Sequence, residues 1–207
     1  MRIHTKATQD GLTPELALDI LKEGNQRFMN NIKTHRNLLQ QVNETSAGQF
    51  PFAAILSCID SRTSAELIFD QGLGDVFSIR IAGNILNEDI LGSMEFACKM
   101  AGSKLVVVLG HTKCGAIEGA CDNIVLGNIT SLLSKIKPAI SKETETKENR
   151  TGSNKLFVRN VTVHNVFLTV QKVRQQSRIL NELEQSGQIK IVGGLYDLDT
   201  GEVTFYE

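Results

Sequence analysis

Two short polar clusters hold the side chains of this sequence that are best suited to chemistry. They are Cys58–Arg62, with the sequence CIDSR, and His111–Cys114, with the sequence HTKC. Thiolates, an imidazole and a carboxylate are ligand types that proteins use to bind zinc. Cys58, His111 and Cys114 have the composition of a catalytic zinc site, and Asp60 offers a fourth ligand that can leave. The two clusters therefore predict a metal site.

Arg62 lies two residues beyond Asp60, so its guanidinium can compete with a metal for that carboxylate. Zinc bound by two thiolates and a neutral imidazole carries no net charge, and binding of Asp60 would add a negative one. When Arg62 pairs with Asp60 instead, the fourth metal position is free for water. Two thiolates acidify that water less than imidazoles do, so activity is expected to favour alkaline conditions.

Each cluster directly follows an apolar run that is typical of a buried strand, at residues 53–58 and 104–110. Further strands are predicted at 76–81, 188–196 and, as a short last one, 202–206. Helices are expected over residues 14–31, 63–71, 87–101, 115–121, 129–141, 155–175 and 177–186.

This alternation predicts an α/β fold with an open, mostly parallel four-stranded sheet, a short fifth edge strand and flanking helices. Ligands bind at the carboxyl ends of strands in such sheets, so both clusters should meet at one edge.

The whole chain, residues 1–207, is interpreted as one domain, with an N-terminal helical arm over 1–50 and an α/β core over 51–207. Residues 32–50 are polar and are expected to form an extended segment or loop. The amphipathic helix at 14–31 could therefore pack on its own core or on a neighbouring subunit. Exchange with a neighbour is the favoured alternative.

Composition narrows the range of functions to expect. The chain has 207 residues, 41% of them hydrophobic, and a net charge of −1, which gives no reason to expect nucleic-acid binding. No apolar run reaches the ~20 residues that a membrane helix needs. The first residues lack the apolar segment of a secretory signal, so a cytoplasmic location is expected. A disulfide framework is not expected, and Cys98 and Cys121 are interpreted as buried thiols outside the metal site.

Several strings together resemble the β-class carbonic anhydrases of bacterial type. They are Cys58–Arg62, Arg80–Asn84 (RIAGN), Gly110–Gly115 (GHTKCG), Glu23–Phe28 (EGNQRF) and Gly193–Asp197 (GGLYD). The resemblance implies one Zn²⁺ per chain, bound by the two cysteines and the histidine of the clusters. The aspartate of the first cluster either binds zinc in a closed form or pairs with the arginine and accepts a hydrogen bond from zinc-bound water.

The same resemblance suggests the substrate pocket. Gln49 matches a side chain that hydrogen-bonds substrate or bicarbonate, Phe77 matches an apolar wall, and the Gly115 backbone region would orient oxygens. A turn-capping Gln49 and a Phe77 that is plain core remain alternatives. Phe96 stands where many relatives have Tyr, and Ile55 where bicarbonate-regulated relatives carry Trp, which argues against that regulation.

The implied activity is the reversible hydration of carbon dioxide to bicarbonate and a proton by zinc-bound hydroxide, in a homodimer or homotetramer. One alternative is hydrolysis of CS2 or COS on the same scaffold, and another is a noncatalytic, zinc-stabilised module with Asp60 kept on the metal. A nucleotide-binding protein is a weaker alternative, because no Gly-rich fingerprint follows the first strand. No proton shuttle is identifiable, and no membrane or nucleic-acid partner is expected.

Overall fold

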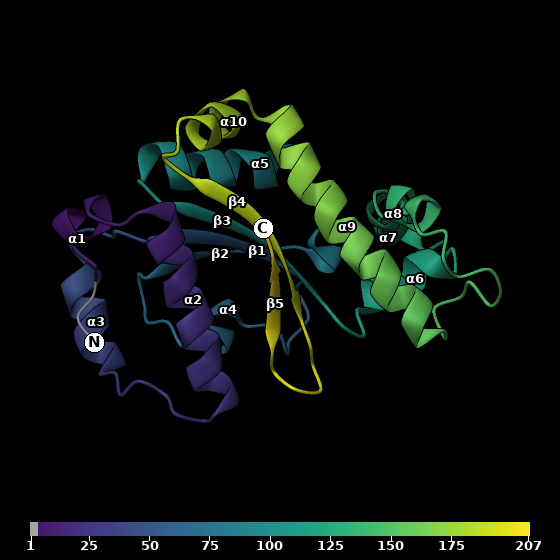
Figure 1. The fold of residues 1–207 in the computed structure, drawn as a ribbon, viewed down its shortest axis with the longest axis horizontal. Coiled ribbons are helices and arrows are strands. Elements are labelled where there is room, and N and C mark those ends of the chain that lie inside the picture. Colours follow the sequence, from purple (N-terminus) through teal and green to yellow (C-terminus); the bar gives the residue numbers. More distant parts are fainter. Residues whose placement is uncertain (1–3) are drawn as a thin grey trace.

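A five-stranded sheet forms the centre of the molecule in the computed structural model, which describes residues 4–207 (Figure 1). The strand order is β2-β1-β3-β4-β5, and all neighbours are parallel except β4 and β5. The strands are β1 (Ala53–Ser57), β2 (Val76–Arg80), β3 (Leu105–His111), β4 (Lys190–Tyr196) and β5 (Val203–Tyr206). The predicted fold class is therefore confirmed, with the antiparallel fifth strand at one edge.

Helices surround this sheet. They are α1 (Lys6–Asp10), α2 (Pro14–Met29), α3 (Leu38–Thr45), α4 (Ala65–Ile68), α5 (Glu88–Glu95), α6 (Gly115–Cys121), α7 (Gly127–Ser134), α8 (Lys137–Lys142), α9 (Lys155–Gln176) and α10 (Arg178–Gln185). Two short irregular turns add to them, a 3-10 turn at Ala82–Asn84 and a π turn at Phe96–Met100. No helix within residues 4–207 combines the length and the apolar character needed to cross a membrane.

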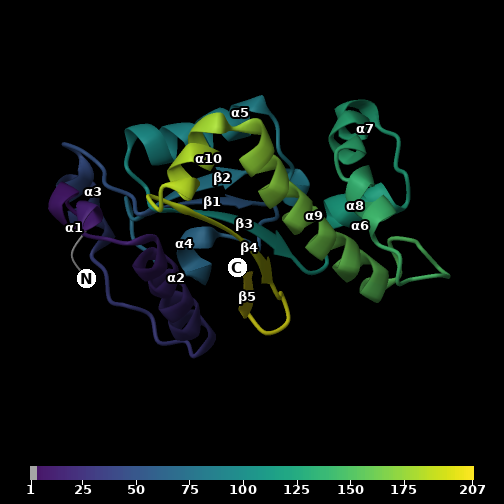
Figure 2. The same ribbon diagram turned by 45° about the horizontal axis from the view of Figure 1, so that its top comes forward.

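The sheet is covered on both faces. Alternate side chains of β3 enter a core with α2 and α4 on one face, and those between them enter a core with α5, α9 and α10 on the other. Figure 2 shows α6, α7 and α8 gathered beyond one end of the sheet, beside the first half of α9. Because β1 and β3 are buried along their whole length, their sequences are continuously apolar rather than alternating.

Four predicted segments differ from the structure. The helix expected over 63–71 covers only Ala65–Ile68. Helix α3 lies within the segment expected to be extended, where Asn37 caps it by accepting a hydrogen bond from the Gln40 amide. The predicted helix at 129–141 is divided into α7 and α8, and Pro138 stands in the first turn of the second one. The helix expected over 87–101 is α only to Glu95 and ends in the π turn.

The predicted arm does not extend away from the core. Ala17, Leu18 and Leu21 of α2 are buried against the chain's own sheet, so the favoured exchange with a neighbour is not the arrangement seen here. Gly24 lies so close to α4 that a Cβ atom would come within 1.8 Å of the Phe69 carbonyl oxygen. Asn25 accepts a hydrogen bond from the Val203 amide at 2.9 Å. Residues 1–3 of the predicted arm lie outside the described residues.

A buried carboxylate joins the arm to the core. Asp70 accepts hydrogen bonds from Arg27 at 2.6 Å, from Arg36 at 2.5 Å and from the Thr34 hydroxyl at 2.8 Å. Burial raises the pKa of Asp70, but these donors lower it further, and the result is about 2. The cluster therefore stabilises the folded chain at every pH at which this carboxyl is ionised.

We expect Asp70→Asn to lower the free energy of unfolding by about 2 kcal/mol at neutral pH, the equivalent of the lowered pKa. Since the folded pKa lies below the unfolded one, this contribution is complete above about pH 4 and disappears as the pH falls towards 2. Urea unfolding of wild type and Asp70→Asn at pH 7 and pH 3 measures this contribution to the free energy of unfolding. Asp10→Asn, which breaks the exposed Lys6–Asp10 pair, is the control and should have a smaller effect. A difference between wild type and Asp70→Asn that stays constant with pH would contradict this account.

Candidate metal centre

Neighbouring parallel strands place the two polar clusters side by side. Strand β1 ends at Ser57, directly before Cys58, and its neighbour β3 ends at His111. Cys114 then stands at the residue directly before α6. Lys113, with φ of 55°, provides the left-handed turn between the strand and this helix. The chain thus returns a second thiol to the edge where the first one lies.

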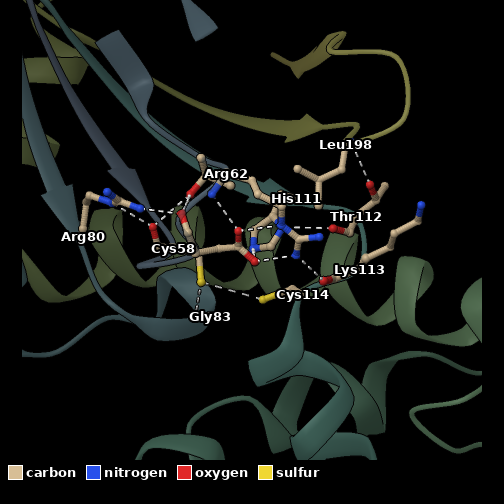
Figure 3. A network of polar contacts seen from close by, with 11 residues as sticks. Cys58, Arg62, Arg80, Gly83, His111, Thr112, Lys113, Cys114 and Leu198 are labelled. Atoms are coloured by element: carbon tan, nitrogen blue, oxygen red, sulfur yellow. Dashed lines mark hydrogen bonds and ion pairs between the residues drawn. The ribbon is translucent and has the colours of Figure 1, made fainter. Parts of the chain in front are cut away.

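The predicted ligands Cys58, His111 and Cys114 come together in one buried group. Their ligand atoms all lie within 4.8 Å of one another, and the two sulfurs are 3.9 Å apart (Figure 3). The three residues are at most 4% exposed. Within residues 4–207, no second group of three or more metal-ligating side chains comes together in this way.

The imidazole is oriented for a metal. Its Nδ1 lies 2.9 Å from the Thr112 carbonyl oxygen, so Nδ1 carries the proton in the neutral tautomer. Its Nε2 is buried and has no hydrogen-bond partner. A buried polar atom without a partner is costly, whereas a lone pair at Nε2 is what a metal ligand requires. The Leu198 amide also donates to the Thr112 hydroxyl at 3.0 Å and anchors this loop to the β4–β5 turn.

The group fits zinc. Two sulfurs bound to tetrahedral zinc at about 2.3 Å lie about 3.8 Å apart, which matches the observed 3.9 Å. The donor set of two thiols and one imidazole is also a known catalytic zinc set. Cys58 and Cys114 would therefore hold the ion together with His111.

The two thiols share their charge unequally. The hydrogen bond from Cys114 lowers the pKa of Cys58 to about 4, against the opposing effect of burial. The same contact raises the pKa of Cys114, and burial raises it further. The contact therefore favours a thiolate on Cys58 over one on Cys114, and binding of a dication would displace thiol protons from the pair.

Asp60 is held by Arg62 rather than by the ligand group. The guanidinium forms two parallel hydrogen bonds to the carboxylate, Nε to Oδ1 at 2.9 Å and Nη2 to Oδ2 at 2.6 Å. These bonds hold the pKa of Asp60 well below its usual range. The Asp60 Oδ2 atom lies 4.0 Å from His111 Nε2, so the carboxylate stands beside the ligand group.

Two residues that contact the Cys58–Arg62 segment were not predicted as site residues from the sequence. Arg80 donates from Nε to the Cys58 carbonyl at 3.0 Å and from Nη2 to the Asp60 carbonyl at 2.5 Å (Figure 3). The Gly83 amide donates to the Cys58 sulfur at 3.3 Å. Both residues belong to the string Arg80–Asn84 at the exit of β2, which carried part of the family resemblance, and this was the available signal.

The three predicted substrate residues are not all near the ligand group. Gly115 directly follows Cys114 and begins α6. Gln49 is an exposed residue before β1, at the opposite end of that strand from Cys58. Phe77 pairs with Ala54 in the first half of β1, about 10 Å before the strand end.

The phenylalanine ring lies in a groove between β2 and α5. Phe77 contacts Phe96 edge to face there, with 6.3 Å between the ring centroids.

The other two cysteines, Cys98 and Cys121, behave as predicted, because neither belongs to the ligand group. Burial raises the pKa of Cys98 to about 12 and that of Cys121 to about 11.

Comparison with known proteins assigns the family. Residues 53–203 match the family model described as carbonic anhydrase. Carbonic anhydrase 2 of Mycobacterium tuberculosis is 36% identical over 196 residues, which cover 91% of this chain and 90% of the relative. A carbonic anhydrase of Mycolicibacterium smegmatis is 32% identical and covers 92% of each chain.

Solved structures agree with this assignment. The β-carbonic anhydrase CcaA is 25% identical, with a TM-score of 0.71 over 92% of this chain and 87% of that one. The Coccomyxa β-carbonic anhydrase, solved with acetazolamide, is 22% identical and shares the fold, with a TM-score of 0.72 over 90% and 85% of the two chains. The buried Cys58–His111–Cys114 group, the sequence relatives and the fold therefore agree that this chain belongs to the β-carbonic anhydrase family and is a carbonic anhydrase, a lyase.

Proposed function

We propose that this carbonic anhydrase binds one Zn²⁺ at Cys58, His111 and Cys114 and catalyses the reversible hydration of carbon dioxide to bicarbonate and a proton. The observation that carries the proposal is the buried, unpartnered Nε2 of His111 beside two sulfurs at zinc-site spacing. Three ligands leave a tetrahedral ion with one further position. The pairing of Asp60 with Arg62 supports an open fourth position, because that carboxylate is already bound.

When bound, zinc would supply the Lewis acidity that makes water nucleophilic near neutral pH. The chain's own residues then set the geometry. Asp60 stays ionised because Arg62 holds its pKa low, so it acts as a hydrogen-bond acceptor and a poor base. Arg62 fixes the direction of that acceptor by the two parallel hydrogen bonds. This fixed acceptor would orient a nucleophilic water by its hydrogen bond.

The substrate pocket is proposed to need a second subunit. Gly115 lies next to the ligand group and can orient substrate oxygens, but Gln49 and Phe77 of the same chain lie towards the far end of the strands. These two residues can therefore reach a metal centre only if another copy brings them there, as a homodimer or homotetramer would. Two fungal structural relatives from Sordaria macrospora are described as tetrameric, which supports such an assembly.

The state of the cysteines bears on location, and the pairing of Asp60 bears on the noncatalytic alternative. All four cysteines are free thiols, which supports a reducing compartment such as the cytoplasm. A noncatalytic module would keep Asp60 on the metal, and the bidentate pair with Arg62 argues against it.

Metal content tests the ligand assignment. Wild-type protein should bind one zinc per chain, measured by elemental analysis after gel filtration in metal-free buffer. Cys58→Ser and Cys114→Ser should each lose most of it, because zinc binds thiolate far better than a hydroxyl. Cys98→Ser is the matched control, a buried thiol outside the group, and should retain full occupancy. Full zinc occupancy in the Cys58 and Cys114 variants would contradict the assignment.

Stopped-flow hydration of CO2 tests the activity and the role of Asp60. Asp60→Asn should keep zinc but lose roughly 100-fold in kcat/KM, because an amide replaces the charged acceptor that orients the nucleophile. Sulfide release from CS2 and COS is measured in parallel. Zinc-loaded wild type that releases sulfide but does not hydrate CO2 above background would overturn the proposed substrate.

Arg62→Ala tests the open position. Without its guanidinium partner, Asp60 is free to bind the metal and close the site, so activity should be confined to more alkaline pH than in wild type. The pH profile of kcat/KM measures this shift. Arg178→Ala, which breaks the exposed pair with Glu182 on α10, is the control and should leave the profile unchanged. Coinciding profiles for wild type and Arg62→Ala would rule out the competition between metal and arginine.

A further inference from the structure

We propose that Asn165 is a positioning residue of the metal centre, which acts through Gly83 on the sulfur of Cys58. The inference rests on the proposed function, because it concerns how this chain prepares a metal ligand. Asn165 lies on α9, more than 80 residues from Gly83 in sequence, and nothing in the two polar clusters points to it.

The contact at the sulfur is the first step. The Gly83 amide donates to Cys58 Sγ at 3.3 Å. A hydrogen bond to a thiolate fixes the direction of its lone pairs and withdraws charge that would otherwise go to a metal. The position of this one amide therefore affects both the geometry and the donor strength of Cys58.

Gly83 can hold this position only in an unusual backbone conformation. Its φ is 66°, in the left-handed region that favours glycine. A Cβ atom there would also come within 2.9 Å of Ile136 and 3.3 Å of Ala116. Glycine is required, but glycine alone allows many other conformations, so neighbouring contacts must select this one.

Contacts on both sides of Gly83 make that selection. Before it, the Ile81 amide donates to the Ser57 carbonyl at 3.1 Å and continues the pairing of β2 with β1. After it, the Asn165 side chain donates from Nδ2 to the Gly83 carbonyl at 2.9 Å, in a buried environment. The strand fixes the entry to the turn, and Asn165 fixes its exit.

Packing alone does not explain an asparagine at this position. Asn165 is 3% exposed in the middle of α9, a helix that packs on β3 and β4. A buried amide is unfavourable unless it is hydrogen-bonded, and asparagine is a poor residue for a helix interior. Its bond to Gly83 compensates for both and connects the helix to the metal centre.

The test uses full-length protein with Asn165→Leu, which removes the donor, and Asn165→Asp, which keeps the shape but places an oxygen against the Gly83 carbonyl. Thr169→Val is the matched control, a buried polar group one turn further along the same helix. The readouts are the sulfur-to-metal charge-transfer band of cobalt-loaded protein and the zinc dissociation constant from competition with a chromophoric chelator.

Both Asn165 variants should move the cobalt band to lower energy, because a sulfur without its amide donor is easier to oxidise. Their zinc affinity should fall roughly tenfold, because losing the contact that orients this ligand outweighs the gain in donor strength of the sulfur. Thr169→Val should leave both quantities at the wild-type value. A wild-type band and affinity in either folded Asn165 variant would overturn the proposal. Failure of wild-type protein itself to bind cobalt or zinc would instead overturn the proposed function on which this inference rests.

Discussion

The parallel pairing of β1 with β3 is the constraint on which the rest of the structure depends. It brings the residues that follow one strand beside the last residue of the other, so that Cys58 and His111 meet at one edge of the sheet. The left-handed turn at Lys113 then returns Cys114 to the same place. A buried group of two sulfurs and one imidazole follows from this topology, because ligand sites in α/β sheets form at the carboxyl ends of strands.

The charges of the site residues give the ligand group and Asp60 different roles. A thiolate pair beside a neutral imidazole would balance the charge of a dication, so a bound ion would add little net charge to this buried environment. The nearby carboxylate of Asp60 would upset that balance, and its bidentate pairing with Arg62 keeps it neutralised at the edge of the group. The backbone carbonyls of the same loop are bound by Arg80, so two arginines fix one short segment.

Much of this could be predicted from the sequence. Continuous apolar runs identified the buried strands, and polar residues directly after them identified Cys58, Asp60, His111 and Cys114. The packing of α2 could not be predicted, because an amphipathic helix shows the same pattern whether it covers its own core or a neighbour's. The proposed role of Asn165 could not be predicted either, because it depends on a contact between a helix and a turn that are far apart in sequence.

We propose that zinc is bound by two sulfurs and one imidazole nitrogen, with the fourth position kept open by Arg62. A crystal structure of zinc-loaded protein at neutral pH, with an anomalous difference map, tests it most directly. The account predicts a zinc peak within about 2.3 Å of Cys58 and Cys114 Sγ and about 2.0 Å of His111 Nε2, with solvent at the fourth position and Asp60 still paired with Arg62. A zinc ion bound by Asp60 in place of solvent, or a peak elsewhere in the chain, would contradict it.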